Sequence, residues 1–88
     1  MIILIDQSFQ KDAKRIPSDV QRKLKQLIQE IQQANSFSQI GCEKLSGYQN
    51  AYRIRLGNYR IGIYKEDETV VLSRVLNRKE IYRYFPKK

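Results

Sequence analysis

The first part of the chain contains two patterns of apolar residues, one typical of a strand and one of a helix. Residues 2–5 are all apolar and mostly β-branched, and Asp6 follows them directly, which indicates a short strand. The next apolar residues, at the spacing of a helix, are Phe9, Ala13 and Ile16. We therefore predict a strand over 2–5 and a helix of about two turns, which Ser8 caps and Pro17 ends.

A second and longer helical pattern follows Pro17. Ser18 is expected to cap this helix, and the negative charge of Asp19 suits the positive end of its dipole. One side of the predicted helix is apolar: Val20, Leu24, Leu27, Ile28, Ile31 and Ala34. The other side is polar and basic: Arg22, Lys23, Lys25, Gln26, Gln29, Gln32 and Gln33. We expect the two helices to form an α-hairpin that packs its apolar side against a sheet.

After a loop-like stretch over 35–50, the apolar period changes from that of a helix to that of a strand. Residues alternate over 51–56 and 59–64, and Gly57-Asn58 between them suits a two-residue hairpin turn. This turn pairs Arg55 with Arg60 and Arg53 with Gly62. The expected core face holds Tyr52, Ile54, Leu56, Tyr59, Ile61 and Ile63. The other face holds Arg53, Arg55, Arg60, Gly62 and Tyr64.

The last third of the chain predicts one more strand and a short tail. An acidic turn at 66–68 leads into a strand over 69–75. A three-residue turn places Arg74 opposite Arg60, and a change of one residue in the turn moves it. The tail over 77–85 forms either a short helix or an extended arm. The fold class is thus α+β in the order β-α-α-β-β-β, with an α-hairpin on a small, mainly antiparallel sheet and one domain over 1–88.

The charge is strongly positive and unevenly distributed. The chain has 17 Lys and Arg against 9 Asp and Glu, a net charge of +8. Residues 1–50 hold seven basic and five acidic residues, whereas 51–88 hold ten basic and four acidic ones. All six tyrosines lie after position 47. This balance favours a polyanionic partner, which is a nucleic acid, an acidic protein or, less favoured, an anionic membrane.

Several residue types that support common chemistries are missing. The chain has no histidine, which excludes an acid–base mechanism with two imidazoles. The single Cys42 excludes an internal disulfide and fits a reducing compartment. With these residues we expect no metal and no cofactor. No apolar run is long enough for a membrane span, and the apolar start lacks the basic lead and the cleavage site of a signal peptide, so we expect a cytoplasmic protein.

Three arginines on one sheet face are the main candidate for a functional site. Arg55 opposite Arg60 destabilises a sheet by a few tenths to about 1 kcal/mol. We expect no acidic side chain on that face, so the balancing anion comes from outside, and a phosphate matches the guanidinium fork. Gly62 would let a bound backbone approach. The alternative is that these three arginines have no ligand and simply form a solvated sheet face.

Arginine and tyrosine together suit the cleavage of RNA. Guanidinium groups stabilise a pentacoordinate phosphorane and a departing oxyanion, and a tyrosine among them is a suitable proton acceptor. RNA supplies its own nucleophile, the 2′-hydroxyl, so the reaction needs neither a metal nor an activated water. The products would be a 2′,3′-cyclic phosphate and a 5′-hydroxyl.

Three segments resemble the RelE/ParE superfamily of type II toxins. They are Lys44-Leu45-Ser46-Gly47, Tyr52-Arg53-Ile54-Arg55-Leu56-Gly57-Asn58-Tyr59-Arg60-Ile61 and Val75-Leu76-Asn77-Arg78-Lys79-Glu80-Ile81-Tyr82. The length, the first strand and the α-hairpin agree with the family as well. The resemblance implies a small cytoplasmic bacterial toxin that a cognate antitoxin neutralises. RelE-like members enter the ribosomal A site and cut the mRNA there.

The resemblance also implies roles for individual residues. By position, Arg53 and Arg55 match residues that contact and activate the scissile phosphate. Arg60 matches the arginine that stabilises the transition state. Arg78 matches a basic residue near the leaving group, and Tyr82 matches the tyrosine that helps to activate the 2′-hydroxyl. Further RNA contacts are expected from Lys44, Arg74, Lys79 and Arg83.

The chain differs from the family pattern at positions that transfer protons in the best-known members. Arg53 and Arg55 stand where the best-known nucleases carry lysines, and Asn77 stands where many relatives carry histidine. Because arginine does not give up its proton, proton transfer falls largely on Tyr82. Two other functions remain open: a ParE-like inhibitor of DNA gyrase, and a catalytically silent basic binding module.

The resemblance and the basic sheet face together predict the partners. A cognate antitoxin with an acidic toxin-binding segment should cover Arg53, Arg55 and Arg60 or displace the tail. The ribosome and mRNA are the other partners. We expect no membrane partner, and oligomers only through the antitoxin complex.

Overall fold

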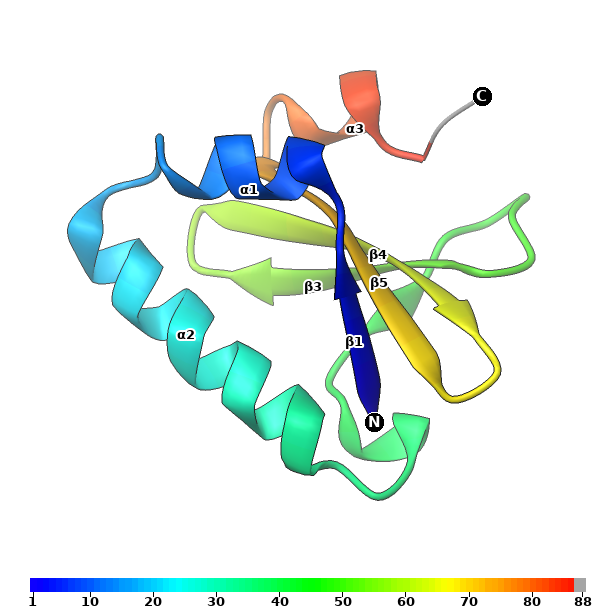
Figure 1. The fold of residues 1–88 in the computed structure, drawn as a ribbon. Helices are drawn as coiled ribbons and strands as arrows, with labels where there is room; N and C mark the ends of the chain where they lie inside the picture. Colours follow the sequence, from blue (N-terminus) through cyan, green and yellow to red (C-terminus); the bar gives the residue numbers. More distant parts are fainter. Residues whose placement is uncertain (87–88) are drawn as a thin grey trace.

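The computed structural model describes residues 1–86, and Figure 1 shows how its elements are arranged. The elements are β1 (Ile2–Ile5), α1 (Gln7–Ala13), α2 (Ser18–Gln33), a 3₁₀ turn η1 (Phe37–Gln39), β2 (Glu43–Lys44), β3 (Ala51–Leu56), β4 (Tyr59–Glu66), β5 (Thr69–Asn77) and α3 (Ile81–Tyr84). The predicted α+β class is confirmed, and so is the helical form of the tail. The predicted domain extends to residue 88, and its last two residues lie outside the described part of the chain.

The strands form one sheet in the order β1-β5-β4-β3-β2. β1 runs parallel to β5, and the other neighbours are antiparallel. The sheet is therefore mainly antiparallel, as predicted, with one strand more than expected. β2 lies within the stretch that the sequence indicated as a loop, because its two residues are too few to establish a period of two.

The hairpin of β3 and β4 has the predicted register. Arg55 lies opposite Arg60 and Arg53 opposite Gly62 across the Gly57-Asn58 turn. The next hairpin differs, because Glu66 already pairs with Thr69 and the turn is therefore two residues long. A register shift near Gly62 then places Arg74 opposite Gly62 rather than opposite Arg60. The predicted pairing of Arg74 with Arg60 is wrong for these two reasons.

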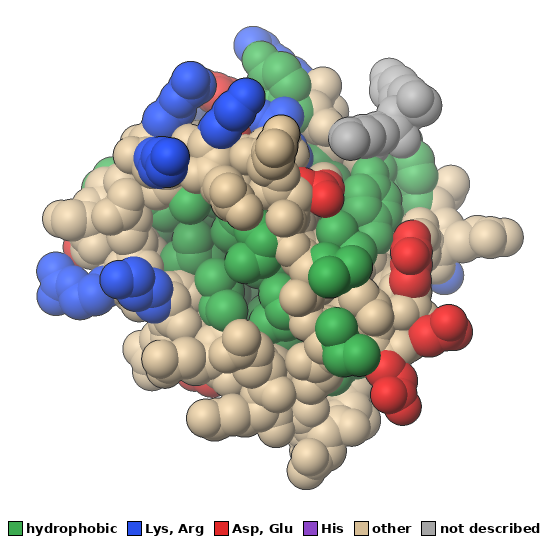
Figure 2. Space-filling model, in the orientation of Figure 1, with side chains coloured by type: hydrophobic (Ala, Val, Ile, Leu, Met, Phe, Trp, Pro, Cys, Tyr) green, Lys and Arg blue, Asp and Glu red, His purple; other side chains and the backbone are tan. Residues whose placement is uncertain are grey.

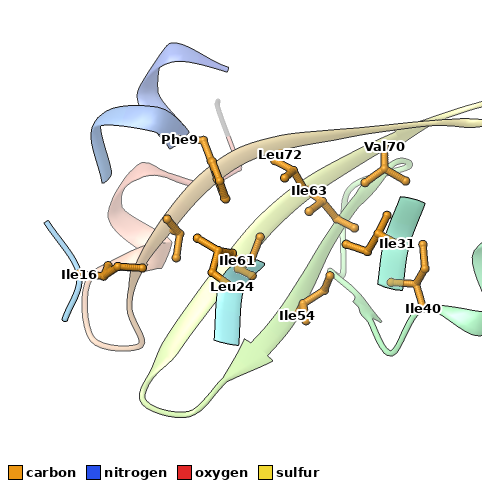
Figure 3. Close-up of a cluster of buried hydrophobic side chains, with 11 residues drawn as sticks. Phe9, Ile16, Leu24, Ile31, Ile40, Ile54, Ile61, Ile63, Val70 and Leu72 are labelled. Carbon is orange, nitrogen blue, oxygen red and sulfur yellow. The ribbon is translucent and has the colours of Figure 1, made fainter. Parts of the chain in front are cut away.

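The α-hairpin covers one face of the sheet and forms the main core. Leu24 and Ile31 are the buried positions of α2, and they join one cluster with the inward side chains of the sheet. Figure 3 shows this cluster, to which the strands contribute Ile54, Ile61, Ile63, Val70, Leu72 and Val75. None of the helices in residues 1–86 has the length and apolar character needed to span a bilayer.

Both predicted helix caps are wrong. Ser8 lies inside α1, and its hydroxyl donates a hydrogen bond of 2.8 Å to the carbonyl of Ser73 on β5. Ser18 is the first helical residue of α2, and Pro17 occupies the cap position without a side-chain hydrogen bond. In the first case a tertiary contact has taken the hydroxyl that local capping would use.

The tail packs against the opposite face of the sheet. Ile81 and Phe85 are buried there with Ala51, and Leu45, Tyr64 and Leu76 are partly buried around them. The ring of Phe85 lies so close over Gly62 that an added Cβ at this glycine would overlap it. The space at Gly62 is therefore filled by the protein's own Phe85, and the prediction that it would admit a bound backbone is wrong.

Candidate nucleic-acid interface

Tyr82 and Arg53 come together although they lie on different elements. The buried anchors Ile81 and Phe85 fix α3 on the sheet, and Tyr82 between them remains half exposed. The Arg53 guanidinium donates a hydrogen bond to the Tyr82 hydroxyl and lies 5.9 Å from the centre of its ring. The pKa of Arg53 is raised above its ordinary value. The hydrogen bond to Tyr82 is the largest cause, and the hydrogen bond to Glu43 is the second. A permanently charged donor is thus in contact with the only tyrosine assigned a role in proton transfer.

Glu43 is a neighbour of the candidate site that the sequence analysis missed. It pairs with Arg53 across β2 and β3, so its side chain is on the arginine face. One carboxylate oxygen lies 3.1 Å from Arg53 Nη2, and the other lies 3.0 Å from Arg55 Nε. The prediction that this face holds no acidic side chain is therefore wrong. The hydrogen bond from Arg53 and then the charges of Arg53 and Arg55 lower the pKa of the carboxyl, so Glu43 is ionised at neutral pH.

Arg60 is oriented by backbone carbonyls of the hairpin turn. Its Nη1 donates hydrogen bonds of 2.7 Å to the carbonyl of Gly57 and 2.8 Å to that of Tyr59. The backbone N–H of Arg78 donates to the carbonyl of Asn58 in the same turn, at 2.9 Å. The exposed Arg78 and the guanidinium of Arg60 are therefore both held at the β3–β4 turn. The repulsion expected between Arg55 and Arg60 is reduced by these carbonyls and by Glu43.

The residues predicted to make further RNA contacts are spread over several surfaces. Arg74 is paired internally with Asp12, described below, and its guanidinium lies 4.9 Å from the ring centre of Tyr84. Lys44 pairs with Tyr52, whose ring contacts Phe37 in the main core, so Lys44 is on the helix-covered face rather than the arginine face. The exposed residues Lys79 and Arg83 lie on the tail, on either side of Tyr82.

The pair of Asp12 and Arg74 joins α1 to β5. Asp12 is buried and accepts hydrogen bonds from Arg74 Nε at 2.7 Å and Nη2 at 3.0 Å. It also accepts one from the backbone N–H of Val75 at 3.1 Å, on the part of β5 that extends beyond β1. The hydrogen bond to Asp12 raises the pKa of Arg74. Asp12 therefore accepts a hydrogen bond from the free edge of β5, and the Nε and Nη2 donors of Arg74 are already occupied.

Charge is also divided on the face seen in Figure 2. Lysine and arginine side chains cluster over α1 and α2, and acidic side chains gather on the opposite side of the view. The predicted polar side of α2 is confirmed, since Arg22, Lys23 and Lys25 are exposed. Among residues 1–86, no group of three or more Cys, Asp or Glu side chains is placed to hold a metal ion.

Comparison with known proteins assigns the family. Residues 3–82 match the model of the ParE toxin of the type II toxin–antitoxin system parDE. Toxin RelE3 of Methanocaldococcus jannaschii is 44% identical over 88 residues, which covers 98% of this chain and 100% of the relative. The toxin in the crystal structure of a RelB–RelE antitoxin–toxin complex from Methanococcus jannaschii superposes with a TM-score of 0.81 at 44% identity, over 94% of this chain and 99% of that one.

The fold also agrees with a more distant structure. The isolated RelE toxin of E. coli has a TM-score of 0.67 at 24% identity, over 93% of this chain and 90% of that one. Together with the extent of the family match, these similarities confirm the resemblance noted in the sequence. The chain belongs to the RelE/ParE superfamily of toxins from type II toxin–antitoxin systems.

Proposed function

We propose that this toxin is an endoribonuclease that cuts mRNA in the ribosomal A site without a metal ion. The observation that carries the proposal is the contact between Arg53 and Tyr82, with Arg55 and Arg60 on the same sheet face. It places donors for a phosphate beside a phenolic oxygen. A cationic site of this kind stabilises charge that develops on phosphorus oxygens, which is where catalysis of phosphoryl transfer gains most.

The proposed reaction is an attack of the 2′-hydroxyl on the adjacent phosphorus. The 2′-oxygen forms a bond to phosphorus, and its proton passes to the Tyr82 oxygen as the phenol gives up its own proton to water. The bond from phosphorus to the 5′-oxygen breaks, which leaves a 2′,3′-cyclic phosphate, and the departing 5′-oxyanion takes a proton from water. Arg53 and Arg55 hold the phosphate, Arg60 stabilises the phosphorane, and Arg78 at the hairpin turn stabilises the departing oxyanion. Lys44, Arg74, Lys79 and Arg83 remain predicted RNA contacts, and the internal partner of Arg74 makes it the weakest of the four.

We propose a protein antitoxin as the second partner. The support is the RelB antitoxin present in the crystal structure of the M. jannaschii RelE complex, together with the +8 charge of this chain. An acidic segment of the antitoxin would cover Arg53, Arg55 and Arg60 or displace α3. In this proposal the toxin acts in the cytoplasm and forms oligomers only through the antitoxin.

The test is inducible expression followed by mapping of transcript ends on ribosome-bound mRNA. The wild type should inhibit growth and produce new 5′ ends within codons. Arg60→Ala should lower the cleavage rate by about 10²–10³-fold, since it removes one preorganised donor to the transition state. Tyr82→Phe should abolish cleavage while keeping the ring. Arg22→Ala, an exposed arginine on α2, is the matched control and should remain toxic. Growth inhibition with intact transcripts would rule out the nuclease.

A second candidate function is inhibition of DNA gyrase. It is favoured by one observation, which is that the matching family model describes ParE toxins. Induction of a DNA-damage response with intact messages would support it. Expression without any toxicity would instead favour a catalytically silent basic binding module.

A further inference from the structure

A carboxylate of the protein itself occupies the donors that the proposed substrate needs. Glu43 bridges Arg53 Nη2 and Arg55 Nε with its two oxygens, at 3.1 and 3.0 Å. A phosphodiester, like a carboxylate, shares one negative charge between two oxygens on one atom, and guanidinium groups bind both kinds of anion through paired N–H donors. The two anions cannot use the same N–H groups at once, and they repel each other at close range.

We propose that Glu43 is an internal competitor for RNA, which holds the arginine pair in the free protein and is displaced by an incoming phosphate. This inference rests on the proposed function, because it takes the arginine face to be the surface that binds RNA. It adds a residue that the family resemblance did not assign and gives it a role opposite to catalysis. Glu43 lowers the affinity for RNA and offsets part of the positive charge of the arginine face when no RNA is present.

The exposure of the pair makes displacement feasible. The side chains of Glu43 and Arg55 remain 51% and 62% exposed. Ion pairs with this degree of exposure contribute little, because water screens them and both side chains lose freedom. Glu43 also lies on β2, an edge strand of two residues, so its side chain can turn outward without disturbing the rest of the sheet. A phosphate therefore meets a weak competitor.

Arg53 has a further donor that its two partners leave unused. Its Nε is buried and has no hydrogen-bond partner among the described residues, while Nη1 binds Tyr82 and Nη2 binds Glu43. A buried donor without a partner is costly, and a bound anion is one way in which this cost is relieved. Displacement of Glu43 would let the guanidinium shift and offer Nε and Nη2 together to one phosphate. The contact with Tyr82 uses the third nitrogen and is free to persist.

The test measures RNA binding separately from cleavage. Fluorescence anisotropy at low salt is recorded with a single-stranded 12-nucleotide RNA whose 2′-hydroxyls are all methylated, so that it cannot be cut. Glu43→Gln should lower the Kd by about three- to ten-fold, since it removes the competing charge and keeps the side-chain shape. Glu30→Gln makes the same change in net charge at an exposed position of α2 and is the matched control. It should change the Kd less than two-fold.

Two further measurements make the outcome decisive. With Arg53→Ala and Arg55→Ala present, Glu43→Gln should no longer tighten binding, because the donors for which it competes are gone. Glu43→Thr, which suits an edge strand, should change the Kd in the same direction as Glu43→Gln and guards against a folding defect in one variant.

The inference is overturned if Glu43→Gln binds no tighter than Glu30→Gln. Weaker binding would overturn it too, since Glu43 would then position the arginines for RNA. The result is independent of catalysis, because the probe cannot be cleaved. Tighter binding by Glu43→Gln in a protein that leaves transcripts intact would keep this inference and reject the nuclease proposal.

Discussion

Two clusters among residues 1–86 pair arginine with a carboxylate, and they differ in how deeply the carboxylate is buried. In the first, Asp12 is 6% exposed and Arg74 is 21% exposed, and Asp12 also accepts a backbone hydrogen bond from Val75. In the second, Glu43 is 51% exposed and bridges Arg53 and Arg55. Removal of one partner from a buried pair leaves an uncompensated charge, whereas water replaces a partner at the surface. The first cluster is therefore part of the architecture, and the second is open to exchange with a ligand.

The largest effect is expected from breaking the buried cluster. Asp12→Ala leaves Arg74 without its carboxylate and the N–H of Val75 without an acceptor. The free energy of unfolding should fall by about 3 kcal/mol, at the lower end for a broken buried pair because part of Arg74 stays hydrated. Urea denaturation measures this loss. Asp19→Ala, an exposed acid in the first turn of α2, is the control and should cost much less. Equal losses would show that the pair of Asp12 and Arg74 is not part of the architecture.

The next effect separates the position of Tyr82 from its chemistry. Gly62→Ala introduces a methyl group where the Phe85 ring lies, and overpacking of this kind costs about 1–3 kcal/mol. Because Phe85 anchors α3, the variant should also move Tyr82 away from Arg53 and reduce cleavage, although both residues are unchanged. Denaturation and transcript-end mapping provide the two readouts.

A second substitution checks that the cause is the overlap of side chains. Phe85→Ala removes the ring, so the cost of Gly62→Ala should largely disappear in the double variant, which is the non-additivity expected for residues in contact. Strictly additive losses would contradict the packing of Phe85 over Gly62.

The exposed cluster should produce a smaller effect that depends on pH. The pKa of Glu43 is lowered in the folded protein, chiefly by the hydrogen bond from Arg53. A lowered pKa gives a stabilisation that is present above the ordinary carboxyl pKa of about 4.3 and is lost as the pH falls through the folded value. The Tm of the wild type should therefore exceed that of Glu43→Gln slightly at pH 7, and the difference should shrink as the pH falls below about 4.3. A difference that does not shrink on acidification would mean that the substitution acts through β2 rather than through the charge.

The contrast between the clusters also explains which features the sequence could predict. The register of β3 and β4 was predictable because the Gly57-Asn58 turn is local and the alternation on both sides confirms it. The partner of Arg74 was not predictable. The length of the β4–β5 turn and the register shift after it decide which residue of β4 lies opposite Arg74, and its carboxylate partner, Asp12, lies on a helix far away in the sequence. Glu43 was missed because β2 is too short to have a pattern and exists only through its pairing with β3.

The smallest effect concerns Cys42, which directly precedes Glu43 and packs against the main core. Partial burial raises the pKa of its thiol, so less thiolate is present in the folded protein than in the unfolded chain at the same pH. Alkylation by iodoacetamide at pH 8.5 should therefore be several-fold slower in buffer than in urea. Because only the Glu43 side chain needs to turn outward, RNA binding should leave this rate unchanged. Faster alkylation on addition of the methylated RNA would show that β2 detaches as a whole, and the exchange at the arginine pair would then involve the sheet edge itself.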